Sequence, residues 1–157
     1  MRLVIFDIDG TLTDTSKIDG ECFLRACVEV FGFAGLDGDW SHYENVTDVG
    51  IFREIFESRT GRVPDSDETA RFRRHFIDLL RSAACARAFA PIAGAPALLE
   101  RLTSTEGIQV ALATGCWADA ARVKAAAMFG QIRQLLSAEE DQAMRVHPWG
   151  QALGPQG

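Results

Sequence analysis

Residues 3–12 read LVIFDIDGTL, and this stretch decides the fold. Its first four residues form a continuous apolar, β-prone run, which is typical of a strand covered on both faces inside a parallel sheet. Gly10 breaks the pattern directly after Asp7 and Asp9. We therefore expect the acidic pair at the carboxyl end of a strand, where open α/β sheets bind their ligands.

A second apolar run, IQVALAT at residues 108–114, predicts another buried strand, which ends at Thr114 and Gly115. A short helix is expected before it, around residues 97–102, and a longer one after it, from Trp117 to Met128. A helix between two parallel strands favours the right-handed crossover. The expected fold class is α/β with a Rossmann-like parallel sheet.

Between the two strands the pattern is helical. Ile18, Cys22, Ala26 and Val30 recur every four residues, and two further amphipathic helices are expected around residues 51–56 and 72–83. These helices predict an all-helical cap at residues 16–90, inserted into an α/β core made of residues 1–15 and 91–140. Residues 141–157, rich in Gly, Pro and Gln, are expected to be an irregular tail.

Composition limits the choice of partners and compartment. The net charge of −6 and the pI near 5.0 argue against a nucleic-acid-binding surface. No apolar run approaches the ~18 residues that a membrane span needs, and none at the N-terminus is long enough for a signal peptide. The four cysteines form no CxxC pair, and Cys22 and Cys27 are expected in the core. We therefore expect a cytoplasmic protein without membrane contact.

Two carboxylates at a strand end suit the cleavage of an alkyl phosphate. Asp7 and Asp9 are two residues apart, so in an extended backbone both side chains lean to the same side. One carboxylate can attack phosphorus and form an aspartyl-phosphate, while the other protonates the leaving oxygen. The pair therefore predicts a nucleophile and a general acid.

Donors for the phosphate oxygens are expected from both strand ends. Gly10 and Thr11, both expected to bind the substrate, turn the chain so that backbone amides can face the phosphate oxygens. Thr114 offers a hydroxyl and Gly115 an amide from the other strand. Fixed dipoles of this kind stabilise charge on the equatorial oxygens.

These segments resemble the haloacid dehalogenase superfamily. Residues 7–12 are similar to its first signature, ALATG with Thr114 to its second, and PIAGA at residues 91–95 to the segment that re-enters the core after a helical cap. The resemblance implies that Asp7 is the nucleophile and Asp9 the general acid and base. It also implies that Mg²⁺ is held by Asp7 and by the Asp9 backbone carbonyl, and that Thr114 binds the phosphoryl group.

The second aspartate favours a phosphatase over a dehalogenase, because a halide leaves without a proton. The cap resembles those of phosphoglycolate-phosphatase-like and β-phosphoglucomutase-like members, which implies a small phosphorylated metabolite as substrate. Thr47 and Asp48 resemble the polar pair that begins the substrate-facing cap helix; a plain helix N-cap is the alternative interpretation.

Two elements of the family pattern are missing from the sequence. One is the basic residue beside the phosphate: Lys124 is interpreted as a solvated or snorkelling side chain, and Arg145 in EEDQAMR is the weak match for that role. The other is a strand that ends in GDxxxD and holds the metal. The acidic cluster at residues 139–141 (Glu139, Glu140 and Asp141) is either a substitute ligand set or a solvated surface.

Three hypotheses follow. The chain is a Mg²⁺-dependent phosphatase, a catalytically impaired phosphate-binding remnant made by truncation or a frame change, or an interaction module that lacks the metal-binding strand. In the family the strand at residues 3–6 has a neighbour on each side, and this chain supplies only one of them. We therefore expect an exposed sheet edge and self-association through it.

Overall fold

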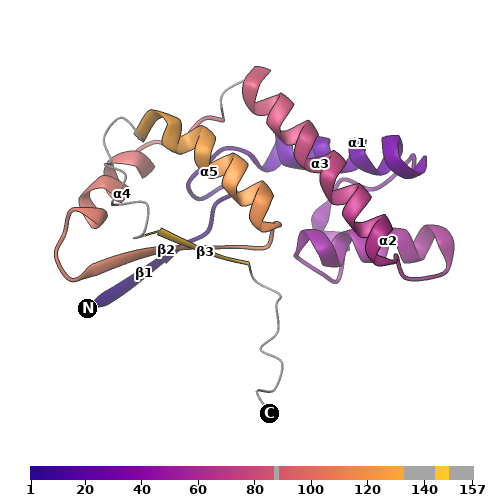
Figure 1. The fold of residues 1–157 in the computed structure, drawn as a ribbon, viewed down its shortest axis with the longest axis horizontal. Coiled ribbons are helices and arrows are strands. Elements are labelled where there is room, and N and C mark those ends of the chain that lie inside the picture. The colour runs from indigo at the N-terminus through magenta and orange to yellow at the C-terminus, as the bar shows by residue number, and fades with distance from the viewer. Residues whose placement is uncertain (87–88, 133–143, 149–157) are drawn as a thin grey trace, which may run out of the picture.

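The structure is a computed structural model that describes the backbone of residues 1–86, 89–132 and 144–148, and the side chains as far as residue 126. A small sheet with helices α4 and α5 beside it is joined to a group formed by helices α1, α2 and α3 (Figure 1). In chain order the elements are β1 (Arg2–Phe6), α1 (Ser16–Phe31), the 3-10 helix η1 (Trp40–His42), α2 (Asp48–Thr60), α3 (Ser66–Ala86), α4 (Ala95–Thr103), β2 (Ile108–Thr114), α5 (Ala118–Ile132) and β3 (Met144–Pro148).

The three strands form a parallel sheet in the order β1-β2-β3. Phe6 pairs with Leu112, and Thr114 at the end of β2 pairs with Pro148. The carboxyl ends of all three strands therefore meet at one edge, directly before Asp7 and directly at Thr114. The predicted α/β class and its parallel sheet are confirmed.

The strand β3 corrects one expectation. Residues 144–148 lie inside the segment that was expected to be an irregular tail, yet they pair with β2 along its length. The prediction failed because MRVHP has no apolar run of its own. Its strand conformation is set by hydrogen bonds to β2, which supplies an open edge for it.

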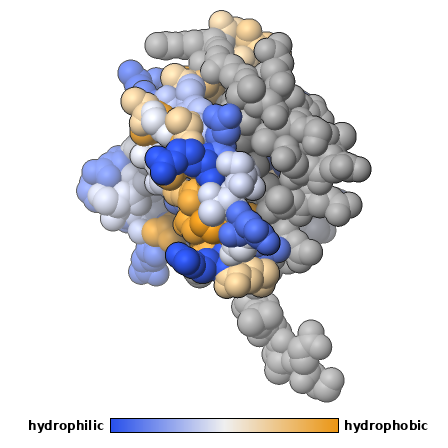
Figure 2. All heavy atoms as spheres, turned by 90° about the vertical axis from the view of Figure 1, so that its left-hand side faces the viewer, coloured by the Kyte–Doolittle hydropathy of each residue, from blue (hydrophilic) through white to orange (hydrophobic). Residues whose placement is uncertain are grey.

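The strand β1 is less covered than its sequence indicates. Leu3 and Ile5 are 58% and 54% exposed, whereas Val110 and Leu112 on β2 are buried. In the described residues β1 has one strand neighbour, and α4 and α5 both lie on the same side of the sheet in Figure 1. From the β1 end of the molecule, Figure 2 shows an apolar area bordered by hydrophilic residues.

Helices α1, α2 and α3 pack around aromatic side chains, as their apolar stripes predict. Phe52 of α2 stacks on Phe72 of α3 with ring centroids 4.2 Å apart, and Phe23 of α1 meets Phe72 at 4.9 Å. Cys22 and Cys27 are buried, as expected. Burial raises the pKa of the Cys27 thiol to about 12, so it acts as a small apolar side chain.

Both ends of the helical segment are joined at the sheet. The amide of Ile92 donates to the carbonyl of Leu12, and the amide of Asp14 donates to the carbonyl of Ala90, each at 2.9 Å. The chain therefore enters and leaves the helical segment through two neighbouring stretches, residues 12–14 and 90–92, which are hydrogen-bonded to each other. In the described residues no helix is long and apolar enough to cross a membrane.

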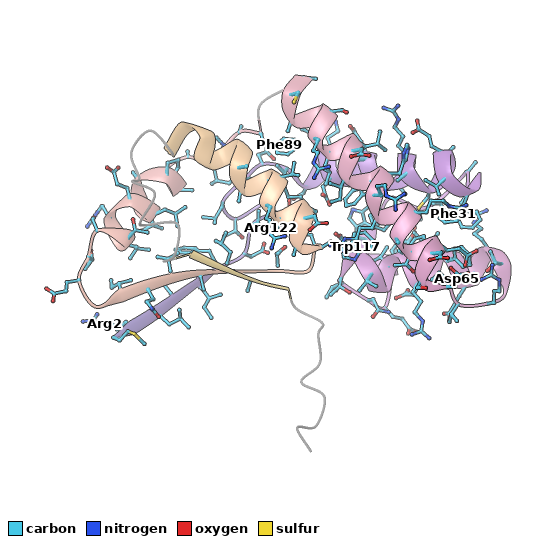
Figure 3. The ribbon with its side chains drawn as sticks, in the orientation of Figure 1. Arg2, Phe31, Asp65, Phe89, Trp117 and Arg122 are labelled. Atoms are coloured by element: carbon cyan, nitrogen blue, oxygen red, sulfur yellow. The ribbon has the colours of Figure 1, made fainter. Side chains whose placement is uncertain are left out.

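Trp117 connects the sheet to the helical segment from the opposite side. It follows β2 and lies where α5 meets helices α1 to α3 (Figure 3). Its ring packs against Phe72 and Phe76, with centroids 5.8 and 6.0 Å away. Nearby, Arg73 of α3 pairs with Asp119 of α5 at 2.8 Å. The two parts of the molecule thus share one continuous apolar core.

Candidate active site

A cavity of about 260 Å³ lies at the carboxyl edge of the sheet, between the strand ends and the helical segment. One group of lining residues comes from the sheet and another from α1, η1 and the start of α2. The lining consists of Asp7, Asp9, Ser16, Asp19, Phe23, Trp40, Val46, Asp48, Ile51, Thr114, Gly115 and Cys116.

Asp7 is the first residue after β1, and its side chain is exposed. Its Oδ2 atom accepts a long hydrogen bond of 3.4 Å from the hydroxyl of Thr11. Gly10 turns the chain back with a φ of +77°, a backbone conformation that residues other than glycine rarely adopt. The turn keeps the Asp7 carboxylate open to the cavity.

The backbone amides of this turn correct another expectation. The amide of Gly10 donates to the carbonyl of Thr13 at 2.8 Å, and the amide of Thr11 donates to the carbonyl of Ile8 at 3.3 Å. Because both donors are used inside the turn, they do not face a phosphate. The amides of Ile8 and Asp9 take part in none of these turn bonds, so they are the better candidates.

Asp9 is held by two side chains. The hydroxyl of Thr15 donates to its Oδ1 atom, and the ammonium of Lys124 lies 2.7 Å from its Oδ2 atom. Thr13 and Thr15 also share a hydrogen bond of 2.7 Å between their hydroxyls. Asp9 is therefore oriented by the chain on both sides, whereas Asp7 is free to face a ligand.

The interpretation of Lys124 as a solvated side chain is wrong. Lys124 is fully buried, and its Nζ atom lies 2.7 Å from Asp9 Oδ2 and 2.6 Å from Asp19 Oδ1. The contact with Asp19 has the distance of an ion pair without the angles of a hydrogen bond. Burial alone would lower the pKa of Lys124, but the carboxylates of Asp19 and Asp9 raise it well above its usual value.

The helix α5 explains how this lysine reaches the site. Ala120 and Ala121 are both fully buried, and Lys124 follows them by four and three residues, so it shares their face of the helix. Ala120 and Ala121 belong to the apolar core, so this face of α5 is turned inward. The sequence contains a signal for this position. A lysine three and four residues after two alanines lies on the same helix face as they do, and if that face is buried the lysine is buried with it.

Thr114 ends β2 with its side chain buried. Its hydroxyl oxygen accepts from the amide of Cys116 at 3.3 Å, and its hydroxyl proton is donated to the Cys116 sulfur at 3.2 Å. Burial raises the pKa of the Cys116 thiol to about 12, so the sulfur stays protonated near neutral pH. Because a thiol sulfur is a weak acceptor, a ligand oxygen in the cavity could take over this proton of Thr114.

Thr47 and Asp48 begin α2 directly over the strand end. Thr47 is the N-cap, and its hydroxyl accepts from the amide of Gly50 at 3.2 Å, as the N-cap interpretation predicts. Asp48 donates from its amide to the carbonyl of Gly115 at 3.0 Å, and its Oδ2 atom accepts from the amide of Trp117 at 2.8 Å. These two bonds fasten the start of α2 to the loop after β2.

Gly115 allows this contact to be close. A Cβ atom at this position would lie 2.5 Å from the carbonyl oxygen of Val46, which is closer than real Cβ contacts come. Burial raises the pKa of the neighbouring Asp48 carboxyl to about 7, and the charge of Asp19 adds to this effect. Asp48 thus changes charge near neutral pH.

The remaining sequence candidates lie at the edge of the described chain. Arg145 is in β3, paired through its backbone with Ala111, three residues and about 10 Å before the strand end at Thr114. Its side chain is outside the described residues, so its role stays a prediction. Glu139, Glu140 and Asp141 also lie outside the described residues.

Two oxygen donors at the site suit a hard cation. The Asp7 carboxylate is open to the cavity, and the backbone carbonyl of Asp9 accepts none of the turn hydrogen bonds. Oxygen ligands of this kind are the ones that Mg²⁺ prefers. No group of three or more His, Cys, Asp or Glu side chains suited to a metal occurs in the described residues.

The sequence of residues 1–150 matches the model of the haloacid dehalogenase-like hydrolases. The chain belongs to this family. The haloacid dehalogenase-like fold, a parallel sheet joined to a helical segment, accounts for the strand-end position of Asp7 and Thr114. A comparison with curated protein sequences finds no match.

Solved structures resemble this haloacid dehalogenase-like chain in fold. CbbY from Rhodobacter sphaeroides, in complex with phosphate, is 18% identical with a TM-score of 0.69 over 97% of this chain and 65% of its own. A hydrolase from Pseudomonas syringae is 19% identical with a TM-score of 0.65 over 92% and 59%. A predicted phosphoglycolate phosphatase from Haemophilus somnus 129pt is 15% identical with a TM-score of 0.59 over 99% and 65%. The chain therefore spans less than two thirds of these proteins.

Proposed function

We propose that this haloacid dehalogenase-like protein hydrolyses a small phosphate monoester through an aspartyl-phosphate intermediate on Asp7. The observation that carries the proposal is the ion pair of Asp9 with the buried Lys124 beside the open carboxylate of Asp7. It gives one carboxylate free to attack and a second one that is fixed in position. The family match and its phosphatase-like neighbours in fold support the same reaction class.

In the first half-reaction, an Asp7 oxygen attacks phosphorus and the bond from phosphorus to the leaving oxygen breaks. Asp9 enters this step as the protonated carboxyl and gives its proton to that oxygen, so the product leaves as an alcohol and Asp9 becomes the carboxylate that Lys124 contacts. In the second half-reaction, Asp9 takes a proton from water, and the hydroxide attacks the phosphorus of the aspartyl-phosphate. Inorganic phosphate leaves and Asp7 returns to its starting state.

Lys124 and Thr114 support these steps. The ammonium of Lys124 holds Asp9 and places positive charge beside a site that gathers several negative charges. The Thr114 hydroxyl and the amides of Ile8 and Asp9 are the donors for the phosphoryl oxygens. When bound at Asp7 and the Asp9 carbonyl, Mg²⁺ neutralises charge on the phosphoryl oxygens.

The test uses p-nitrophenyl phosphate and a matched set of three variants. Asp7→Asn should remove turnover and any acid-stable, hydroxylamine-labile phosphoprotein. Asp9→Asn should lose more activity toward alkyl phosphates than toward aryl ones, because a phenolate leaves with less help from an acid. Asp14→Asn is the control, since Asp14 is exposed and lies outside the cavity lining.

Persistent turnover in Asp7→Asn would overturn the assignment of the nucleophile. Phosphate binding without turnover in the unmodified chain would point instead to the impaired phosphate-binding remnant.

A further inference from the structure

The part of the cavity that belongs to the helical segment combines aromatic and acidic side chains. Phe23 of α1 and Trp40 of η1 meet edge to face with centroids 5.5 Å apart, and both line the cavity. Asp19 and Asp48 line it from α1 and α2. The proposed phosphate chemistry uses the strand ends and leaves this half of the cavity for the alcohol part of the substrate.

The charges of this half do not balance. Among the described residues, the cavity lining contains four aspartates and no Arg, Lys or His side chain. The buried Lys124 already contacts Asp9 and Asp19. Asp48 has no cationic partner within the described residues, since its contacts are the backbone groups of Trp117 and Gly115.

Asp48 is 8% exposed, and a buried carboxylate without a cation is unfavourable. Its Oδ2 atom accepts from Trp117, and its Oδ1 atom makes no hydrogen bond within the described part of the chain. A ligand that brings a positive charge to this oxygen would relieve that cost. An aromatic wall next to a carboxylate is also the arrangement that favours an organic cation.

We propose that the substrate is the phosphate ester of a short amino alcohol, whose ammonium group lies between Asp48 and the rings of Phe23 and Trp40. The inference rests on the proposed phosphatase function, because it assigns the other end of the substrate to Asp7. The cavity volume of about 260 Å³ limits the alcohol to a few carbon atoms. Esters whose leaving group carries a carboxylate should bind more weakly, because that carboxylate would face the charge of Asp48.

Three esters of nearly equal size separate charge from shape: 2-aminoethyl phosphate, 2-hydroxyethyl phosphate and carboxymethyl phosphate. Their dissociation constants are measured by calorimetry on the full chain with Asp7→Asn, so that turnover does not interfere. We expect 2-aminoethyl phosphate to bind at least about tenfold more tightly than carboxymethyl phosphate, with the hydroxyl ester between them.

Asp48→Asn, added to Asp7→Asn, should reduce this preference to a few-fold, because the amide still accepts from Trp117 but carries no charge. Glu57→Gln is the matched control: it removes a charge from the same helix, where Glu57 pairs with Arg53 outside the cavity. A melting curve verifies that each variant folds. In the Asp7→Asn chain that keeps Asp48, the preference for 2-aminoethyl phosphate over carboxymethyl phosphate should also shrink below pH 7. There Asp48 takes up a proton, beside the charged groups of Asp19, Asp9 and Lys124.

The results distinguish this inference from the proposed function. Equal affinities, or tighter binding of carboxymethyl phosphate, would overturn the amino-alcohol assignment, even if the unmodified chain hydrolyses p-nitrophenyl phosphate. The expected order of affinities in a chain that hydrolyses nothing would keep the amino-alcohol site and overturn the phosphatase. No binding of any of the three esters would overturn the amino-alcohol assignment, and the turnover of p-nitrophenyl phosphate by the unmodified chain would then decide the phosphatase by itself.

Discussion

The Nζ atom of Lys124 and the Oδ2 atom of Asp9 lie 2.7 Å apart, although 115 positions separate the two residues in the sequence. The same ammonium lies 2.6 Å from Asp19, so one buried cation joins α5 to the turn after β1 and to the first turn of α1. The contact therefore supports the turn after β1 and also fastens the sheet to the helical segment.

Lys124→Met should unfold more easily by at most about 3–5 kcal/mol at pH 7, because it leaves the half-buried carboxylates of Asp9 and Asp19 without their cation. Burial already raises the pKa of Asp19, and losing Lys124 raises it further. The loss of stability should therefore shrink as the pH falls and Asp19 is protonated. Urea denaturation at pH 7 and pH 4 measures this, with the exposed Lys17→Met as control. Equal stability of the two variants at pH 7 would contradict the ion pair.

Asp48→Asn should stabilise the fold above pH 7 and change little below pH 4. The folded-state pKa of Asp48 is raised from 3.8 to about 7, so the folded chain holds this proton more tightly than the unfolded chain does. Its contribution to stability is present at low pH and is lost as the pH rises through this window. The difference between pKa values sets an upper limit of about 4 kcal/mol for the gain.

Melting temperatures of Asp48→Asn and the parent chain from pH 4 to pH 8 provide the measurement, with Glu57→Gln as the control. A variant that melts lower than its parent at pH 8 would show that the charged hydrogen bond to Trp117 outweighs the cost of burial.

Gly115→Ala should weaken the contact between α2 and the strand end, because its Cβ would lie 2.5 Å from the Val46 carbonyl oxygen. We expect a loss of about 1–3 kcal/mol in stability from the forced shift. KM for phosphate esters should rise as the cavity wall at Val46 and Asp48 moves. Gly94→Ala is the control that separates backbone strain from displacement of the cavity wall. Its φ of +85° strains an alanine, but a Cβ there would meet no atom within 4 Å, so the variant should lower stability without changing KM.

Magnesium binding should be weak, with a dissociation constant of about a millimolar or higher, because Mg²⁺ usually takes more than one protein carboxylate. Asp7 and the Asp9 carbonyl are the donors that the described site offers. Titration calorimetry tests this, and Asp7→Asn should remove the signal. A site much tighter than millimolar would mean that another carboxylate takes part, and Glu139, Glu140 and Asp141 are the first to substitute.

Self-association through β1 should be visible at micromolar concentration. Leu3 and Ile5 are exposed on a strand that pairs with β2 alone among the described residues, and an apolar strand edge of this kind invites pairing with another chain. Light scattering should show species larger than a monomer, and Leu3→Lys with Ile5→Lys should reduce them. Val63→Lys, at an exposed site between α2 and α3, is the control. A stable monomer in the parent chain would contradict the prediction.

Much of the architecture could be predicted from local pattern. The apolar runs before Asp7 and Thr114 indicate strands, and the three amphipathic stripes indicate helices, because both signals depend on neighbours within a few residues. The strand β3 was not predicted, because its conformation does not depend on neighbours within a few residues. Its conformation comes from pairing with β2, and its own residues carry no matching pattern.

Burial of single side chains was harder to predict. Leu3 and Ile5 have the composition of a covered strand, yet they are exposed, because burial depends on which elements lie over each face. Lys124 shows the reverse case: a charged residue was expected at the surface, but its helix turns it toward two carboxylates. The turn amides of Gly10 and Thr11 were likewise assigned to a phosphate, but their partners lie within the turn.

The sequence by itself determined the order of the helices and of the first two strands, and the strand-end positions of Asp7, Asp9 and Thr114, because side-chain periodicity is a local property. Only the tertiary structure decided that Lys124 meets Asp9 and Asp19, and that Asp48 closes the cavity over Gly115. These contacts join residues that are far apart in the chain. Their distances depend on how α5 and α2 are rotated and packed: the face of α5 that carries Ala120, Ala121 and Lys124 is turned inward, and Gly115 leaves room for the chain just before α2.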